Sequence, residues 1–220
     1  MAATARLSKE ALVTTAMEIA DAQGLEAVTV RRLAQEHGVT PMALYRHFRD
    51  KEDVLDALAA RLFEQVEMPY QDDRPWDAQM ADVFSAVVRA LRPHPAVAAL
   101  VVTRGLDSEP ALTLAERALG LLANAGFPVE DAAQIAGQAL CSLGALVVSE
   151  PGGGPAAPVD PEEREAAVRA RRATLSALPP ARYPHVVAAA DVLADCPNGD
   201  AYYERGVHAI VGGMRHVRVP

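Results

Sequence analysis

Cysteine and aromatic residues are scarce in this 220-residue sequence, which has two cysteines and an aromatic content of 5%. Cys141 and Cys196 lie far apart, each in an apolar stretch, so we expect two small buried residues rather than a disulfide or a metal site. The histidines in the C-terminal part do not have the spacing of metal ligands. The sequence therefore predicts no metal site and no cofactor.

Motifs that support catalysis are also missing. The sequence contains no Gly-x-Ser-x-Gly nucleophile turn, no glycine-rich phosphate loop after a strand, and no cluster of cysteine and histidine. Its Gly152–Gly154 run lies in a proline-rich stretch, residues 151–161, which we expect to be a flexible loop. The sequence therefore does not predict an enzyme.

Long hydrophobic runs are limited to one segment, residues 132–148. This segment is shorter than the roughly 20 residues that span a bilayer, contains Gln134 and Gln138, and has no flanking cation. We expect a helix buried inside the protein or between subunits, without membrane contact. The N-terminus lacks the apolar core of a signal peptide, so we expect a cytoplasmic protein.

Basic residues are outnumbered, with 21 lysines and arginines against 29 aspartates and glutamates, a formal net charge of −8. This balance argues against a protein that coats nucleic acid non-specifically, because such proteins are usually basic. The deficit is uneven: residues 1–51 hold seven basic and six acidic residues, whereas residues 52–220 hold 14 and 23. A local basic surface in the N-terminal part is therefore compatible with the acidic total.

Alternating runs of β-branched residues, which are typical of strands, are missing as well. Alanine and leucine dominate instead, so the predicted fold class is all-α. The helix-start residues Ser8, Thr29, Thr40–Pro41 and Asp50 predict four N-terminal helices, of which the first two end at glycines. Further helices are expected over residues 76–91, 96–103, 109–125, 130–149, 161–177, 184–194 and 199–216.

Residues 29–45 read TVRRLAQEHGVTPMALY, two short helical segments joined by a tight turn at Gly38, which is a helix-turn-helix pattern. The second helix of such a motif fits the major groove of DNA, where its first turns reach base edges. A three-helix bundle without a DNA-binding role has the same spacing. Charge favours DNA binding, because residues 29–51 carry five cations against two anions.

The run RRLAQEHGVTPMALYRHFRDKEDVLDALA resembles the DNA-binding domain of TetR-family (tetracycline-repressor-like) transcriptional regulators. The shared positions are Thr29, Arg31, Leu33–Ala34, Gly38–Val39, Leu44–Tyr45, His47–Phe48, Lys51 and Leu55–Leu58. The resemblance implies a three-helix DNA-binding domain whose recognition helix covers residues 40–47. We expect Leu44 and Phe48 to lie in the core rather than at DNA.

The residues that the resemblance places at DNA are Thr29, Arg31, Thr40, Pro41, Met42, Ala43, Tyr45, Arg46, His47 and Lys51. Of these, residues 40–43 would face bases, residues 45, 47 and 51 would hold phosphates, and residues 29 and 31 would anchor the preceding helix. Arg46 could reach either a base or a phosphate. Family members often have more polar residues at positions 41–43, so we expect apolar contacts with thymine methyl groups, together with Arg31.

The rest of the chain resembles the C-terminal half of the same family, at residues 124–127, 143–144 and 206–213. In that family this half binds an inducer, and two of its helices pair with a second subunit. The resemblance implies a homodimer formed through Gln134–Ser149 and Tyr202–Met214. Such a dimer suits a palindromic double-stranded DNA operator whose half-sites are about 34–36 Å apart.

The same resemblance divides the chain into three parts. Residues 1–50 would form the helix-turn-helix domain, residues 51–67 a connecting helix, and residues 68–220 a larger helical domain for ligand binding and dimerisation. An effector that binds better when the two DNA-binding domains are wrongly spaced would lower the affinity for the operator.

Candidate contacts for the effector are Glu67, Trp76, Val83, Val87, Arg104, Ala118, Gln134, Gln138 and Cys141. In tetracycline repressors histidine and glutamate help to hold a drug–magnesium chelate, but residues 101–104 here keep only an arginine, so we expect a more apolar small molecule. Gln134, Gln138 and Cys141 share one helix face, which could meet a ligand or a dimer interface, and Trp76 could line the pocket or simply pack.

Together these features predict a homodimeric, ligand-responsive transcriptional repressor. An activator of the same fold is an alternative that the sequence does not separate from a repressor. A helical small-molecule-binding module without operator binding is a second alternative, and the cation cluster between Arg31 and Lys51 argues against it.

Overall fold

The computed structural model describes residues 7–104, 106–155, 157–158, 160–196 and 198–217, and within these ranges the chain is helical without a strand. The elements are α1 (Lys9–Gln23), η1 (Leu25–Ala27, a 3₁₀ turn), α2 (Val30–Glu36), α3 (Pro41–Leu44), α4 (Lys51–Glu64), α5 (Trp76–Leu91), α6 (Pro95–Thr103), α7 (Glu109–Asn124), α8 (Val129–Val148), α9 (Pro161–Ser176), α10 (Pro184–Ala188), α11 (Ala190–Ala194) and α12 (Gly199–His216). The all-α prediction is confirmed.

The predicted start signals of the N-terminal helices act as caps. The side chains of Ser8, Thr29 and Asp50 accept hydrogen bonds from the first-turn backbone N–H groups of α1, α2 and α4. The chain leaves α1 and α2 through Gly24 and Gly38, whose φ angles of 81° and 63° suit glycine. Local polar groups therefore fix where the first helices begin and end.

Three of the expected helices differ from those in the structure, two in where they end and one in being divided. α3 ends at Leu44 and is followed by a turn in which the N–H groups of His47 and Phe48 both bond to the Leu44 carbonyl. α4 ends at Glu64, three residues before the expected end at residue 67. The expected helix over residues 184–194 is two short helices, α10 and α11, that meet at Ala189. The β-branched pair in α10 has low helix propensity, which favours this break.

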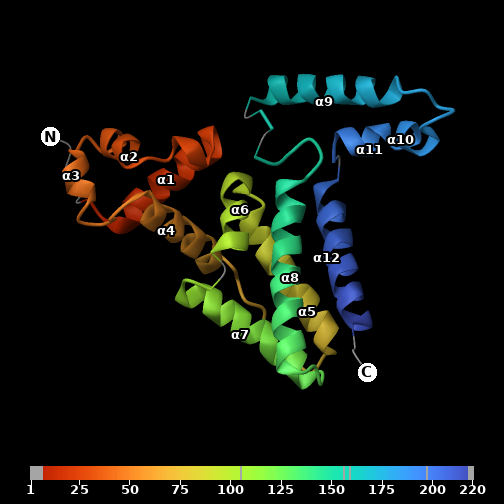
Figure 1. Cartoon of the computed structure of the whole chain (residues 1–220), viewed down its shortest axis with the longest axis horizontal. Helices are drawn as coiled ribbons and strands as arrows, with labels where there is room; N and C mark the ends of the chain where they lie inside the picture. The colour runs from red at the N-terminus through yellow and green to blue at the C-terminus, as the bar shows by residue number, and fades with distance from the viewer. Residues whose placement is uncertain (1–6, 105, 156, 159, 197, 218–220) are drawn as a thin grey trace.

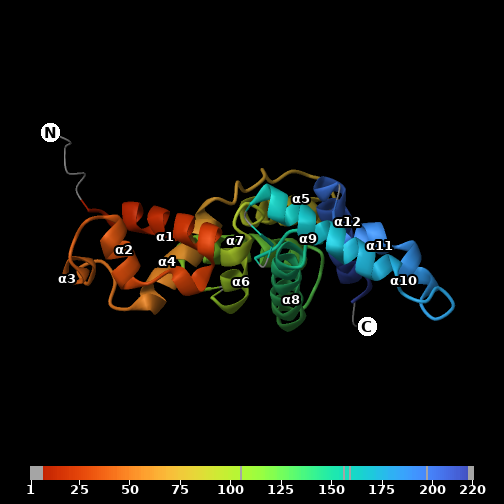
Figure 2. The same cartoon turned by 90° about the horizontal axis from the view of Figure 1, so that it is seen from above.

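The helices form a broad, flat molecule (Figure 1 and Figure 2). Seen from above, α1–α3 lie at one end and α9–α11 at the other (Figure 2). Between them α5, α8 and α12 pack against one another, and α6 and α7 fill the space between α4 and α8. α4 begins against α1 and reaches the helices of the body, so it links the two regions.

One hydrophobic core runs through both regions. At the N-terminal end Leu33, Leu44 and Phe48 are almost fully buried, which confirms the core role expected for the last two. In the body, α5 contributes the most completely apolar face, from Met80 to Leu91. The segment before α5 is fixed by Gln79, whose side-chain amide donates to the backbone carbonyls of residues 72 and 74.

α8 is the central helix of the body. By length and composition it is the one described helix that could cross a membrane. In its most apolar stretch of 18 residues, 33% is buried within the protein. One of its faces packs on α5, α6, α7 and α12. Cys141 is exposed, so the prediction that both cysteines are buried is wrong there. Cys196 is half-buried, and burial raises the pKa of its thiol.

Candidate DNA-binding surface and effector cavity

α2 and α3 pack at an angle around the turn at Gly38, as the helix-turn-helix pattern predicts. Leu44 faces inward from α3, whereas Met42 and Tyr45 are 72% and 52% exposed. Thr40 caps α3 without a side-chain hydrogen bond, so its hydroxyl faces water together with Pro41. Large apolar side chains next to free polar groups are typical of a binding surface.

The five cations between residues 29 and 51 are not equivalent. Arg32 donates to Glu36 at 2.7 Å, and Arg49 makes two bonds with Asp53 at 2.6 and 2.8 Å. The ammonium group of Lys51 lies 3.6 Å from the carboxylate of Glu26, which is fully exposed. The bonds with Arg49 lower the pKa of Asp53 to about 2.

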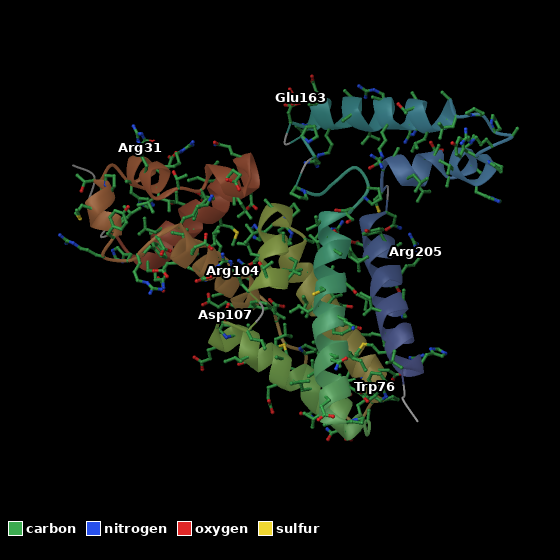
Figure 3. The ribbon with its side chains drawn as sticks, in the orientation of Figure 1. Arg31, Trp76, Arg104, Asp107, Glu163 and Arg205 are labelled. Atoms are coloured by element: carbon green, nitrogen blue, oxygen red, sulfur yellow. The ribbon has the colours of Figure 1, made fainter. Side chains whose placement is uncertain are left out.

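Arg31 and Arg46 differ from the other three. Both are exposed, and within the described residues neither has an acidic partner within ion-pair distance. Figure 3 shows the Arg31 side chain extending outward from α2. A cationic group without an internal partner keeps its full capacity to bind phosphate or a base. Sequence spacing alone could have found part of this distinction, because both arginine–carboxylate pairs are four residues apart.

The body contains a cavity of about 330 Å³ between α4, α5, α6, α7 and α8, and exposed residues such as Leu106 lie at its edge. The side chains that line it are hydrocarbon except for one thiol: Phe63, Val83, Phe84, Val87, Val102, Leu106, Ala111, Leu114, Ala115, Ala118, Leu119, Ala133, Ala136, Gly137, Leu140, Cys141 and Leu143. No ionisable carboxylate, ammonium or guanidinium group is among them. Such a cavity favours a small uncharged molecule.

The predicted effector contacts divide into two groups. Val83, Val87, Ala118 and Cys141 line this cavity. The other five lie outside it: Glu67, Trp76, Arg104, Gln134 and Gln138.

Each of those five has another environment, which corrects the expected grouping. The ring of Trp76, at the start of α5, packs edge-on against Phe127 at a centroid distance of 5.5 Å (Figure 3). Glu67 lies in the connection after α4, and Gln134 and Gln138 lie on the exposed face of α8. Of the α6–α7 wall of the cavity the sequence indicated only Ala118, although Leu114, four residues earlier, lies on the same face of α7.

Arg104, the fifth, joins the body to α4. It follows the last turn of α6, and its guanidinium bonds to the carboxylates of Glu52 and Asp56 on α4. The hydrogen bond with Glu52 is the main reason that the pKa of Arg104 is raised. Figure 3 shows Arg104 at the junction between α4 and the body. A displacement of the end of α6 would therefore be passed to α4 through the bonds of Arg104.

The opposite end of α6 is also bonded to the N-terminal region. His94 precedes α6, and its Nδ1 lies 2.7 Å from Oδ2 of Asp21 on α1. One oxygen of Asp21 and the Nε of Arg104 are buried without a hydrogen-bond partner among the described residues. α6 is thus held to the N-terminal helices by a polar contact at each of its ends.

An exposed recognition helix, joined by one long helix to a helical body with an apolar cavity, defines a ligand-responsive DNA-binding regulator. Residues 8–58 match the family model described as bacterial regulatory proteins, tetR family, and residues 68–218 match the tetracyclin repressor-like C-terminal domain. The chain belongs to the TetR family of transcriptional regulators, which are not enzymes.

Known relatives are similar to this chain over nearly its whole length. A transcriptional regulator of Saccharopolyspora erythraea is 30% identical over 208 residues, 94% of this chain and 84% of the relative. The class C tetracycline repressor of Escherichia coli is 30% identical over 217 residues, 97% and 93% of the two chains. The structure of Streptomyces coelicolor ActR in complex with actinorhodin covers 96% of this chain and 98% of ActR, with a TM-score of 0.75 and 25% identity.

These relationships fix the general behaviour of the protein. TetR-family members are soluble, dimeric proteins that bind DNA operators and small-molecule effectors. The chain is accordingly an effector-responsive, DNA-binding transcriptional regulator.

Proposed function

We propose that this chain is a cytoplasmic homodimeric repressor that an uncharged, apolar effector releases from a palindromic operator. The observation that carries this proposal is the pair of contacts made by the last turn of α6. Val102 lines the cavity on one side of this turn, and Arg104 bonds to α4 just beyond it. A ligand in the cavity therefore acts on the same turn that is bonded to the DNA-binding region.

The operator surface would consist of α3 and the groups around it. Residues 40–43 face the bases, and Tyr45, His47 and Lys51 hold phosphates. The long exposed contact of Lys51 with Glu26 is weak enough to be exchanged for a phosphate. Arg31 and Arg46 add two guanidinium groups that have no acidic partner among the described residues, and the Thr29 side chain caps α2 and so fixes the start of this surface.

In this proposal residues 1–50 bind the operator, residues 51–67 connect, and residues 68–220 bind the effector and the second subunit. The effector is a neutral molecule of modest size, since charge in an apolar cavity has no partner. A tetracycline–magnesium chelate does not fit this description, because the lining lacks oxygen and imidazole ligands.

The dimer would form through residues 134–149 of α8 and 202–214 of α12. These two helices pack side by side, and their exposed faces carry the small residues Ser142 and Ala145 on α8 and Ala209 and Gly213 on α12. Small side chains allow the helices of two subunits to approach closely in a four-helix bundle. Gln134 and Gln138, exposed on α8 and outside the cavity, then belong to the dimer interface.

The proposal is tested with a duplex that the protein selects from a random-sequence pool and with 1-aminoanthracene, a neutral aromatic fluorophore, as the cavity probe. We expect saturating probe to weaken binding of the duplex by about 5–150-fold. In Arg104→Met the probe should still bind, but the ratio of the duplex Kd values with and without probe should approach one.

Arg92→Met is the matched control, because Arg92 makes an arginine–aspartate bond of 2.6 Å to Asp200 within the body. This variant should keep the response of the wild type. Tight probe binding without any change in duplex affinity would contradict the proposed release mechanism. A reporter gene behind the selected duplex distinguishes the repressor from an activator by the sign of its response.

A further inference from the structure

Gly144 lies in α8 against the second half of α6, and it is buried. A Cβ atom at this position would lie 2.8 Å from Cγ2 of Val102 and 3.7 Å from the carbonyl oxygen of Ala98. The second distance is an ordinary van der Waals contact, whereas the first is too short for two carbon atoms. The hydrogen of glycine is therefore what allows the last turn of α6 to rest at its present distance from α8.

Val102 cannot easily yield to an added methyl group. Valine in a helix has one strongly preferred χ1 rotamer, so a methyl group at residue 144 is not absorbed by turning the side chain. Val102 is 41% exposed, so the last turn of α6 has room on its solvent side, and we expect the contact to be relieved by a shift of this turn away from α8. Arg104 follows Val102 by two residues and bonds to Glu52 and Asp56, so the movement reaches α4.

Other glycines of the body lack this role. Gly137 lies on the same face of α8, seven residues earlier, and a Cβ atom there would meet nothing within 4 Å. The nearest atoms to a Cβ atom at Gly206 of α12 would belong to the side chain of Leu146 on α8, and none belongs to α6. Only the contact at Gly144 touches the turn that leads to α4.

We propose that Gly144 is a positioning residue that sets the resting place of α6 and, through Arg104 and α4, the DNA-bound arrangement of the recognition helices. This inference rests on the proposed transmission from the cavity to the operator surface. A methyl group at residue 144 then imitates the effector by displacing the end of α6 without any ligand. Gly144 contacts neither DNA nor effector, and it acts through Val102.

The test measures duplex binding by Gly144→Ala in the absence of any small molecule, with the duplex selected by the wild-type protein. We expect a Kd about 5–150-fold higher than that of the wild type. Gly120→Ala is the matched control, because Gly120 lies inside α7, away from the cavity lining and the DNA surface, and has open space around its Cβ position. Its Kd should stay within about twofold of the wild-type value. An unchanged Kd in a folded Gly144→Ala protein overturns the proposal.

A second variant separates positioning from a general loss of stability. Val102→Ala removes the atom that the added methyl group would strike. Gly144→Ala should then have no further effect, so that the double variant and Val102→Ala agree within about twofold. This comparison also serves if Gly144→Ala alone does not fold. A persistent loss of binding or of helical circular dichroism in the double variant would refute a role through Val102.

Failure of this inference is distinguishable from failure of the proposed function. The wild-type response to 1-aminoanthracene tests the effector mechanism and does not depend on residue 144. Suppose that the probe has no effect on duplex binding, but that Gly144→Ala weakens it and Val102→Ala restores it. The positioning role of Gly144 is then supported, and the cavity is not the effector site.

Discussion

The two ends of the α4 connection bind their partners through opposite physical properties. The surface around α3 is exposed and carries guanidinium groups that have no acidic partner in the part of the chain that the structure describes, in a region of slight positive charge. The cavity beyond α4 is lined by hydrocarbon side chains, in a region where acidic residues exceed basic ones. Binding at the first surface should depend steeply on salt, whereas binding in the cavity should hardly depend on it.

This difference explains why an acidic protein can be a DNA-binding protein. The excess of acidic residues lies after residue 51, and it repels DNA from the body without weakening contacts at α3. Non-specific binding is reduced because only a small part of the surface attracts phosphate.

The largest expected effect concerns the free guanidinium of Arg31. Replacing Arg31 with alanine should weaken binding of the selected duplex by about 1–3 kcal/mol, because a side chain with no internal partner loses its whole contact with DNA. If Arg31 contacts a phosphate, the slope of log K against log salt should also fall by about one. Fluorescence anisotropy over a range of salt concentrations measures both quantities.

The paired arginines supply the control for Arg31. Changing Arg32 and Glu36 together to glutamine removes a 2.7 Å pair and leaves the net charge unchanged. This double variant should bind DNA nearly as well as the wild type. Equal losses of duplex affinity in Arg31→Ala and in the double variant would mean that an internal ion pair does not determine which of the five cations contacts DNA.

A smaller effect is expected from filling the cavity. Ala118→Phe should weaken 1-aminoanthracene binding by at least about 1.4 kcal/mol, a factor of ten, because the ring occupies space that the probe needs. Duplex binding without probe should change little, and its salt dependence should be unaltered.

Ala123→Phe serves as the control for the filled cavity, since Ala123 lies on the exposed face of the same helix, α7. It should leave probe binding unchanged, as measured by probe fluorescence. If Ala118→Phe bound the probe as well as the wild type, the probe would occupy a different site.

The sequence was sufficient where structure depends on neighbouring residues. Thr29 and Asp50 could be recognised as caps because the side chain of each accepts a hydrogen bond from the N–H group three residues ahead. The helix-turn-helix and its buried Leu44 follow from the same local signals. The early end of α3 was missed because Pro41 marks a helix start but gives no information about its length.

The cavity could be predicted only in part, because its walls come from five helices. Val83 and Val87 were recognisable as one face of α5, and they do line it. Arg104 was expected at the ligand, but its partners Glu52 and Asp56 lie about 50 residues earlier in the chain, and no local pattern reveals that contact. Ion pairs with residues distant in the sequence, rather than residue type, determine where the Arg104 side chain lies.

The smallest effect is expected from acid, and it belongs to the DNA-binding side of the comparison. Arg49 lowers the pKa of Asp53 from 3.8 to about 2, so the folded state holds fewer protons than the unfolded state between these values. This contribution to stability is present above the unfolded pKa and is lost as the pH falls from about 5 towards 2. Asp53→Asn should therefore give a shallower decline of Tm over this range, whereas Asp73→Asn, at an exposed carboxylate with no ion pair among the described residues, should follow the wild type. Because the Arg49 side chain of this pair is exposed, the difference in Tm should be small and should shrink in high salt. A decline of Tm in Asp53→Asn as steep as that of the wild type would show that the pair does not stabilise the start of α4.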